Sequence, residues 1–591
     1  MNSLTLALIG AAMVLAGYAL YSKFLAEKIY ALDDSRPTPA VMLDDGVDYV
    51  PTNKYVLWGH HFTSVAGAAP IVGPAVAVIW GWLPAFLWVT IGTVFFAGMH
   101  DLGALWASIR NRGQSIGALS GRYIGARGRN LFLVVIFLVL LMVNAAFSVV
   151  ISNLLVGTPT AVIPTWGALL VALAIGQAIY RLKWSLPLVS VVGVVALYGL
   201  ILLGDNVPLA LPETVLGLPD RSVWIILLFL YAGVASMLPV WMLLQPRDYI
   251  NGLQLFIALG ILYGSVLIAR PEVVAPAYNT NLPEGTPSLV PLLFVTIACG
   301  AISGFHGMVS SGTSSKQLAK EGDARFVGYF GAVGEGLLAL GSIIATTAGF
   351  ATLAQWEDTY QAFNDGGVNA FVQGGGRIVE AGLGLPQSLA ATIIATTAIL
   401  FAATTMDTGV RLKRFVIQEI GQIAGVNLNR MLATVIAVGV GLALTFGAGA
   451  DGSGGMRIWP LFGTTNQLLA ALTLSIVTIM LLRRGRSPLP TLIPLVFLGA
   501  MTIYALLVQL GTFWEQRDWL LLVLDIVILI SALWVIVEAF IAMKSARAYP
   551  GDDDQELALE MEAVAAGSAP RRGGSSTGQG HPQEGTPPPA P

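Results

Sequence analysis

The chain has 591 residues, of which 55% are hydrophobic and only 11% are charged, and its mean hydropathy is +0.74. Soluble globular proteins carry about 25% charged residues, so this composition excludes a soluble protein. The net charge of −3 favours neither nucleic acid nor a strongly acidic partner. The single cysteine, Cys299, excludes an intramolecular disulfide framework. We therefore expect the body of the chain to lie in lipid.

Fifteen apolar runs approach the roughly 20 residues that a helix needs to cross the hydrocarbon. The first run is expected to be retained rather than cleaved, because no Lys or Arg precedes it and no small-residue cleavage pattern follows it. The weakest candidates are the short pair Trp166–Tyr180 and Pro187–Leu203, which Arg181 and Lys183 divide. The runs begin near Leu4, Val56, Leu83, Leu131, Trp166, Pro187, Val223, Leu253, Leu289, Phe326, Pro386, Met431, Trp459, Pro488 and Trp519.

The distribution of Lys and Arg predicts the topology, since cytoplasmic loops are enriched in both. With the N-terminus outside and the C-terminus inside, the inner segments hold 26 of the 31 Lys and Arg residues. The outer connections then hold only Arg221, Arg270, Arg377, Arg457 and Arg517. This bias predicts a multi-pass protein of a cytoplasmic-type membrane.

Two segments outside the spans have a distinct composition. Residues 549–591 are rich in Asp, Glu, Gly, Ser and Pro, and such a segment buries too little apolar surface to fold. We expect a disordered cytoplasmic tail there. The Gly-rich connection from about Ala351 to Leu385 is expected outside, as a cap or as short surface helices.

The second run places Gly67, Pro70, Gly73 and Pro74 at mid-membrane depth, which predicts an interrupted helix. The seventh run shows a similar pattern at residues 233–239 and runs in the opposite direction. Interrupted helices at matching places in oppositely oriented halves are typical of inverted-repeat transporters. The alternative is that Gly and Pro are simply common in membrane helices.

This pattern predicts five domains. They are a peripheral first span (1–25), inverted repeats over 56–203 (spans 2–6) and 223–409 (spans 7–11), a four-span C-terminal region (430–543) and the tail (549–591). Helix N-termini attract anions, so the second half of the second span is expected to bind a substrate carboxylate. The predicted pocket consists of Ser64, Gly67, Ala68, Ala69, Gly233 and Ser236.

Ionisable residues inside spans are expensive to bury and are functional candidates by default. Histidine titrates near neutral pH, which suits a proton-coupled step, although a satisfied buried network is the alternative for each residue. In the ninth run Ser303, His306, Ser310 and Thr313 form a polar stripe at helical spacing, which would also suit interhelical hydrogen bonding. Candidates for ion or proton coupling are His60, His61, His100, Asp101, His306, Ser310, Ser311, Thr313 and Glu335.

Similar depths in spans 3 and 9 predict contact between the His100–Asp101 pair and His306. Such contact would offset the desolvation of the Asp101 carboxylate. Asp407 lies four residues before Arg411, which instead predicts a pair at a helix end.

Four stretches resemble the carbon starvation protein A family: GHHFTSVAGAAPIVGPAVAVIWGWLPAFLWV, GTVFFAGMHDLGALWASIRNRGQSIG, LPVWMLLQPRDYIN and ISGFHGMVSSGTSSKQL. The resemblance covers most of the chain. It implies an inner-membrane transporter that takes up peptides or pyruvate when carbon is scarce, the latter with protons. It also implies the amino acid, polyamine and organocation superfamily and hence a LeuT-type five-plus-five inverted repeat.

The resemblance leaves the coupling ion open. In a LeuT-type arrangement a Na⁺ site lies between the first helix of one repeat and the third of the other, here spans 2 and 9. Ser310, Ser311 and Thr313 are then candidate ligands, while the intramembrane His and Glu residues favour protons.

Other classes of function fit less well. An intramembrane metalloenzyme would use His60, His61, His100 and His306, but the chain lacks an HExxH motif. A phosphate-binding loop is also absent from the sequence, so ATP is not expected to drive the process, and no cofactor is predicted. The expected partners are a small solute, H⁺ or Na⁺, and the bilayer, with the oligomeric state left open.

Overall fold

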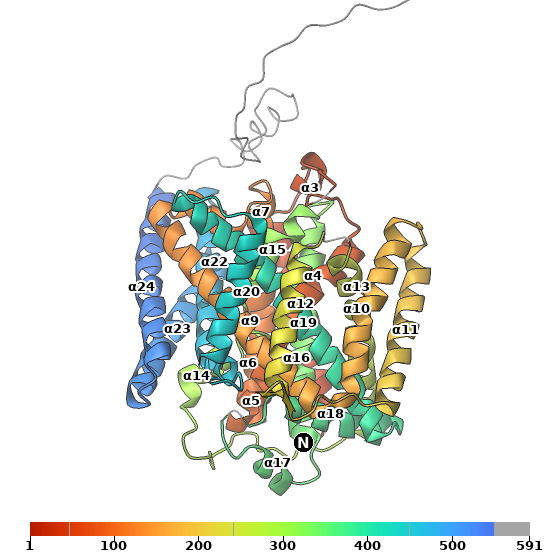
Figure 1. Ribbon diagram of the computed structural model, residues 1–591. Helices are drawn as coiled ribbons and strands as arrows, with labels where there is room; N and C mark the ends of the chain where they lie inside the picture. The colour runs from red at the N-terminus through yellow and green to blue at the C-terminus, as the bar shows by residue number, and fades with distance from the viewer. Residues whose placement is uncertain (47, 240–241, 364, 448, 549–591) are drawn as a thin grey trace, which may run out of the picture.

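The structure is a computed structural model that describes residues 1–548 except 47, 240–241, 364 and 448. It is a bundle of α-helices standing roughly side by side (Figure 1). A short antiparallel hairpin, β1 (Thr214–Val215) with β2 (Leu218–Pro219), precedes one of the helices. The predicted tail at 549–591 lies outside the described residues.

Among the described residues, twelve helices are long and apolar enough to cross a membrane. Their apolar length explains their formation, because a spanning backbone must satisfy its hydrogen bonds internally. They are α1 (Ser3–Ala16, continued by η1, α2 and η2 to Ile29), α6 (Trp82–Gly92) with α7 (Gly98–Ile109), α9 (Ala126–Gly157), α10 (Val162–Tyr180), α11 (Leu186–Asn206), α12 (Asp220–Met237), α13 (Leu244–Ala269), α16 (Phe330–Ala348, preceded by η7), α19 (Gln387–Ile423), α22 (Trp459–Arg483), α23 (Leu489–Glu515) and α24 (Trp519–Ala548).

Three of the fifteen predicted runs have other forms. The second is α4 (Lys54–Ala66) and α5 (Ala69–Ala77), bent by 46° at the break, and it makes a thirteenth span if counted as one. The ninth is two short helices, α14 (Leu289–Thr296) and α15 (Gly304–Gly312), and the twelfth is the 17-residue α20 (Arg430–Phe446). The expected count of fifteen spans is therefore not confirmed.

The remaining segments are short or lie at the ends of the bundle. They are α2 (Ser22–Phe24), α3 (Pro39–Met42), α8 (Ile116–Tyr123), α17 (Leu353–Thr359), α18 (Gly367–Leu383), α21 (Gly454–Arg457), the π-helical turns η1 (Gly17–Tyr21), η2 (Leu25–Ile29), η4 (Thr93–Ala97) and η7 (Arg325–Tyr329), and the 3₁₀ turns η3 (Val78–Trp80), η5 (Pro159–Ala161) and η6 (Ser314–Lys316). The expected surface helices after Ala351 are α17 and α18, which lie at the same end of the bundle as the N-terminus (Figure 1).

The predicted break in the seventh run is wrong. α12 continues through Gly233 to Met237, and Pro239 lies in the connection to α13. An isolated glycine costs a helix only about 1 kcal/mol, whereas a proline just beyond a helix end is an ordinary stop signal. The second interruption lies instead in the ninth run, at residues 297–303 between α14 and α15.

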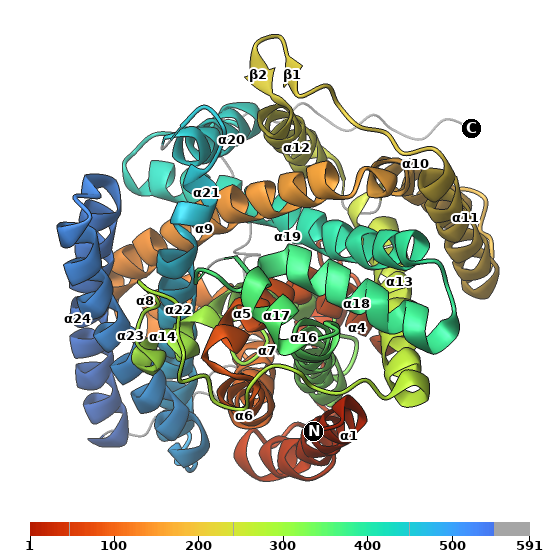
Figure 2. The same cartoon turned by 90° about the horizontal axis from the view of Figure 1, so that it is seen from below.

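The core lies around α9, α19 and α22, whose residues are mostly buried. The helices α23 and α24 lie at one edge of the bundle and the α10–α11 hairpin at the opposite edge (Figure 2). These outer helices expose many large apolar side chains, as expected of surfaces that face lipid tails rather than water. The interrupted helices are inside, where α4 packs against α15 and α5 against α14.

Candidate functional site

The first interruption is closed tightly by α9 and α19. Gly67 has a φ of +41°, a backbone conformation that favours glycine. A Cβ at this position would lie 2.7 Å from Oγ1 of Thr405 and 2.9 Å from the ring of Phe147. Ser64, Ala68 and Ala69 are buried beside it. Glycine is therefore the residue that permits both the break and the close approach of the neighbouring helices.

The second interruption is held by an asparagine that sequence reasoning missed. The backbone N–H of Phe305 donates to Oδ1 of Asn466 at 2.9 Å, and Nδ2 of Asn466 donates to the Ser303 hydroxyl at 3.0 Å. Gly300, with a φ of +94°, lies against Pro70 of the first interruption. Irregular backbone at membrane depth persists only where protein or water satisfies it, and Asn466 supplies that partner from α22.

A cavity of about 340 Å³ leads toward the first interruption. It reaches Ser64, one helical turn before Gly67, and it begins among the segments that the Lys and Arg bias assigns to the inner side. Both signs of charge line it. The polar lining residues are Asp48, His60, Ser64, Ser115, Gln245, Ser311, Thr313, Lys316, Gln317, Thr408, Arg411 and Glu419.

The structure does not bring Gly233 and Ser236 to this pocket. Gly233 faces α20, where a Cβ would lie 3.1 Å from Val438. The Ser236 hydroxyl donates to the Gly233 carbonyl at 2.8 Å, and the Ser236 carbonyl accepts from Arg414 at 2.7 Å. These two residues were assigned to the substrate pocket because a break was expected in α12, but α12 is continuous from Asp220 to Met237.

The predicted contact between His100, Asp101 and His306 is confirmed. Asp101 accepts from Nδ1 of His100 and from Nδ1 of His306, each at 2.8 Å. On the far side of the second imidazole, Nε2 of His306 lies 3.2 Å from Oε2 of Glu335, without hydrogen-bond alignment. All four side chains are at most 1% exposed. We call these four residues the histidine–carboxylate cluster.

Small residues allow these helices to approach closely enough to form the cluster. A Cβ at Gly307 would lie 3.2 Å from Cε1 of His100, so α15 fits directly over α7. A Cβ at Gly331 would lie 2.9 Å from Cδ2 of His61, which places α4 against α16. Small residues at helix interfaces in membranes commonly serve this purpose.

His61 lies near the cluster but has a different partner. Its Nδ1 is 2.8 Å from the Ser314 hydroxyl, and its Nε2 has no hydrogen-bond partner among the described residues. His61 therefore ties α4 to the segment after α15.

The three hydroxyls proposed as Na⁺ ligands do not share one set of contacts. Ser311 donates to the Gly307 carbonyl at 2.7 Å and accepts from the Ile116 N–H at 2.9 Å. Thr313 donates to the Val309 carbonyl at 2.8 Å. The Ser310 hydroxyl is buried and has no hydrogen-bond partner in the described part of the chain.

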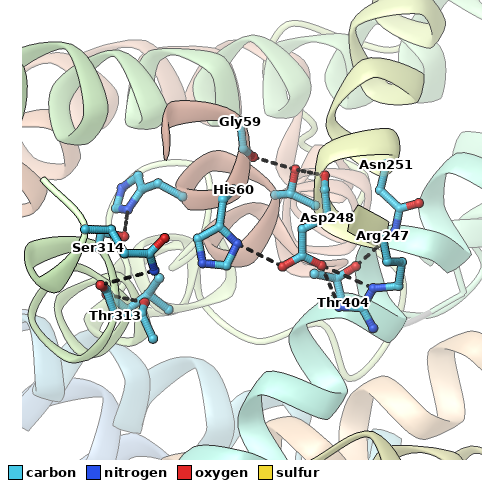
Figure 3. A network of polar contacts seen from close by, with 12 residues as sticks. Gly59, His60, Arg247, Asp248, Asn251, Thr313, Ser314 and Thr404 are labelled. Atoms are coloured by element: carbon cyan, nitrogen blue, oxygen red, sulfur yellow. Dashed lines mark hydrogen bonds and ion pairs between the residues drawn. The ribbon is translucent and has the colours of Figure 1, made fainter. Parts of the chain in front are cut away.

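A second buried network joins α4, α12, α13 and α19, and we call it the arginine–carboxylate network. Asp248 accepts from Nη2 of Arg247 at 2.6 Å and contacts Nδ1 of His60 at 3.1 Å (Figure 3). Arg247 also pairs with Asp407 through both of its terminal nitrogens, with Nη2 3.2 Å from Oδ1. Tyr231 donates to the Asp407 carboxylate at 2.9 Å. His60 therefore contacts this network rather than the histidine–carboxylate cluster.

This network overturns the predicted pair of Asp407 with Arg411. Arg411 donates to the backbone carbonyls of Ala235 and Leu238 at 3.2 and 2.7 Å, and Asp407 lies inside the 37-residue α19 rather than at its end. Arg247 lies in the first turn of α13 and is only 1% exposed, so it is a buried helix residue rather than part of the preceding loop. The sequence did contain an indication of this network: the adjacent opposite charges Arg247 and Asp248 lie at the start of an apolar run.

Metal binding has little geometric support in the part of the chain that the structure describes. No group of three or more His, Cys, Asp or Glu side chains there is arranged to hold a metal ion. Within the histidine–carboxylate cluster, both Nδ1 atoms are already directed at Asp101.

The fold matches those of solved membrane transporters. The crystal structure of a mutant of the Eremococcus coleocola manganese transporter matches with a TM-score of 0.51 at 11% identity, over 85% of this chain and 99% of that one. The same transporter in complex with an aromatic bis-isothiourea substituted compound gives a TM-score of 0.50 at 12% identity over the same shares. The chain is thus an all-α, multi-pass protein of the LeuT-type fold class, as expected.

The sequence comparisons define the family. The model described as carbon starvation protein CstA matches residues 2–351 and 348–505, and the chain belongs to this family. The peptide transporter CstA of Helicobacter pylori (strain ATCC 700392 / 26695) is 32% identical, over 85% of this chain and 81% of that protein. The pyruvate/proton symporter BtsT of Escherichia coli (strain K12) is 30% identical over the same shares. The peptide transporter CstA of Bacillus subtilis (strain 168) is 32% identical, over 85% of this chain and 90% of that protein. The chain is a membrane transporter of this family.

Proposed function

We propose that this transporter imports pyruvate or a short peptide across the bacterial inner membrane, driven by protons, and that it does so in carbon starvation. The observation that carries the proton coupling is the histidine–carboxylate cluster, which holds two buried carboxylates and two imidazoles without a permanent cation. Relatives whose names specify peptide transport or pyruvate/proton symport support the substrate classes. These names also support a protein without enzymatic activity.

The exchangeable proton is proposed to sit on Nε2 of His306. Because the Asp101 carboxylate accepts from Nδ1 of His306, that nitrogen carries a hydrogen in either charge state. Nε2 faces Glu335 on α16, so its protonation completes an ion pair there. Two buried carboxylates without compensating charge are costly in a membrane. The protonation state therefore decides whether α15 is held between α7 and α16.

The substrate is proposed to bind where the cavity meets the first interruption. His306 is the third residue of α15 and lies just beyond the second interruption. The second interruption contacts the first through Gly300 and Pro70, so a movement of α15 would displace the backbone beside the proposed substrate site. At the N-terminus of α5, Pro70 carries no N–H and the Ile71 N–H donates to the Ala68 carbonyl at 3.1 Å. The helix dipole and the N–H of Ala69 are therefore what this end offers to a carboxylate. Ser64, Gly67, Ala68 and Ala69 are the proposed contacts.

The helices that move against each other are proposed to form repeats other than those expected from sequence. α9 packs on α19, and α12 and α20 pack on each other and on both of those helices. α13 packs on α4 and α19, just as α22 packs on α15 and α9. The two sets of contacts are equivalent if the protein consists of two structural repeats. The first repeat would be α4–α5, α6–α7, α9, α12 and α13, and the second would be α14–α15, α16, α19, α20 and α22. The α10–α11 hairpin is then an insertion in the first repeat.

The orientation follows from the charge bias of the connections. The N-terminus is proposed to lie outside and the end of α24 in the cytoplasm. In this orientation the cavity is open to the cytoplasm, which corresponds to an inward-facing state of the transport cycle.

Uptake into proteoliposomes tests the proposal. Labelled pyruvate and labelled dipeptides are offered separately, each with an imposed pH gradient or an imposed Na⁺ gradient. We expect one of the two substrates to accumulate when the outside is acidic and not when only Na⁺ is graded. Accumulation that follows Na⁺ and ignores pH would contradict proton coupling, and accumulation of neither substrate would contradict the substrate class.

A further inference from the structure

The largest of the three most prominent hollows in the described residues lies away from the transport site and is lined by α22, α23 and α24. It has a volume of about 1120 Å³ and an almost entirely apolar lining, with Leu492, Val496 and Phe540 among the residues that are exposed or partly exposed. Because α23 and α24 lie at the edge of the bundle, this groove faces the lipid-filled side of the protein. From these features we propose that it binds one anionic phospholipid of the leaflet in which α24 ends.

The length of the groove fits one leaflet. Along α24 its lining runs from Leu533 to Arg547, which is about 21 Å at 1.5 Å per residue. Half of a hydrocarbon core measures about 15 Å. The groove therefore accommodates acyl chains from the bilayer centre to the interface and leaves one end at headgroup depth.

The charge at that end selects the headgroup. Lys544 and Arg547 are exposed and lie three residues apart on α24, so they share one face of the helix. No Asp or Glu lines the groove, and the Ser487 hydroxyl lies at the same end. Basic pockets between membrane helices on this side bind the headgroups of anionic lipids.

The concave shape comes from a small residue on α23. Gly499 lines the groove, and a Cβ there would meet no atom within 4 Å, so a larger side chain would project into the hollow. Gly511 on the same helix also has open space at its Cβ position but does not line the groove. Comparing substitutions at Gly499 and Gly511 therefore distinguishes the effect of filling the groove from a general effect of changing α23.

A second copy of the chain is a less favourable occupant. A two-fold contact across this face, with its axis along the membrane normal, would place Lys544 and Arg547 of one copy at the same depth as those of the other. Like charges opposed in this way are unfavourable. A phospholipid instead supplies both the apolar chains and the counter-charge.

The test uses the full chain, purified in detergent and titrated with phosphatidylglycerol or phosphatidylcholine, with retained lipid counted by native mass spectrometry. We expect one retained phosphatidylglycerol and at least about tenfold weaker retention of phosphatidylcholine. Gly499→Leu should abolish retention of both lipids, and Lys544→Gln with Arg547→Gln should remove the preference for the anionic one. Gly511→Leu and the exposed basic pair variant Lys23→Gln with Lys28→Gln should behave as the unchanged protein.

Three results would overturn the proposal. One is equal retention of phosphatidylglycerol by Gly499→Leu and Gly511→Leu. Another is a preference for the anionic lipid that survives the loss of both Lys544 and Arg547. The third is a dimer linked in high yield by cysteines at positions 499 and 540, both in the groove lining, which would assign the groove to a second copy.

Discussion

The two buried polar networks of this transporter are built from similar parts but balance their charge differently. Each holds two carboxylates that come from different helices: Asp101 and Glu335 in one, Asp248 and Asp407 in the other. In the histidine–carboxylate cluster the partners are imidazoles, which gain and lose protons near neutral pH. In the arginine–carboxylate network the main partner is Arg247, which stays charged under all physiological conditions. The first network can therefore change its charge during transport, while the constant charge of Arg247 in the second ties α12, α13 and α19 together.

The largest effect is expected from Arg247→Met. Removing the guanidinium leaves Asp248 and Asp407 buried without their main partner, and breaking a buried pair in this way costs about 3–5 kcal/mol. We expect a strongly reduced yield of folded protein and a lower thermal unfolding midpoint. The control is Arg270→Met at the exposed end of the same helix, which should have little effect. An Arg247→Met protein as stable as this control would show that the network does not hold the helices together.

Variants of the histidine–carboxylate cluster should lose coupling before they lose stability. Asp101→Asn and His306→Ala each remove one charge from a pair that can neutralise itself by releasing or binding a proton. We expect folded proteins that still bind and exchange substrate but no longer accumulate it in response to a pH gradient. Asp525→Asn, at another buried carboxylate in α24, serves as control and should transport normally. If Asp101→Asn and His306→Ala keep the normal pH dependence of uptake, Asp101 and His306 are structural and Glu335 becomes the leading proton carrier.

Gly67→Leu should abolish transport because it changes the proposed substrate site, without altering either buried polar network. The new side chain would meet Thr405 and Phe147, and the left-handed backbone adds strain of about 1–3 kcal/mol. Gly59→Ala on the same helix is the control, because its Cβ meets no atom within 4 Å. Uptake is measured alongside the thermal unfolding midpoint. Unchanged uptake in a folded Gly67→Leu protein would rule out this pocket.

The smallest effect is expected from Lys413→Met, which tests whether this buried cation of α19 has the same role as Arg247 on α13. Lys413 is fully buried, and its Nζ has no hydrogen-bond partner among the described residues. Replacing an unpaired buried amine with an apolar chain of similar length should be neutral or stabilise by about 1 kcal/mol. A loss of stability like that of Arg247→Met would mean that Lys413 shares the balancing of Asp407.

Sequence reasoning succeeded where periodicity or depth decided the outcome. The apolar runs predicted the helices, and equal depth in two spans predicted the contact of Asp101 with His306. The break at Gly67 was recognisable because two prolines and a second glycine followed within one short helix. Each of these signals is local in the sequence.

The failures have a common physical cause, which is that partners from distant helices decide the outcome. Pro239 fits either a mid-helix break or a helix end, and the residues around it do not decide between the two. Asp407 was assigned to its neighbour in sequence, although the guanidinium it binds lies 160 residues away. The interruption before α15 depends on Asn466, a polar residue in an apolar run whose role becomes clear only when α22 packs beside it.

The most direct test of the account is substrate-induced proton movement into proteoliposomes that lack an imposed gradient, followed with an internal pH-sensitive dye. Adding the transported substrate should acidify the lumen for the unchanged protein. Substrate entry through His306→Ala should continue downhill without acidification, because the nitrogen proposed to carry the proton is missing. Acidification of equal extent in both proteins would contradict the claim that the histidine–carboxylate cluster carries the coupling proton.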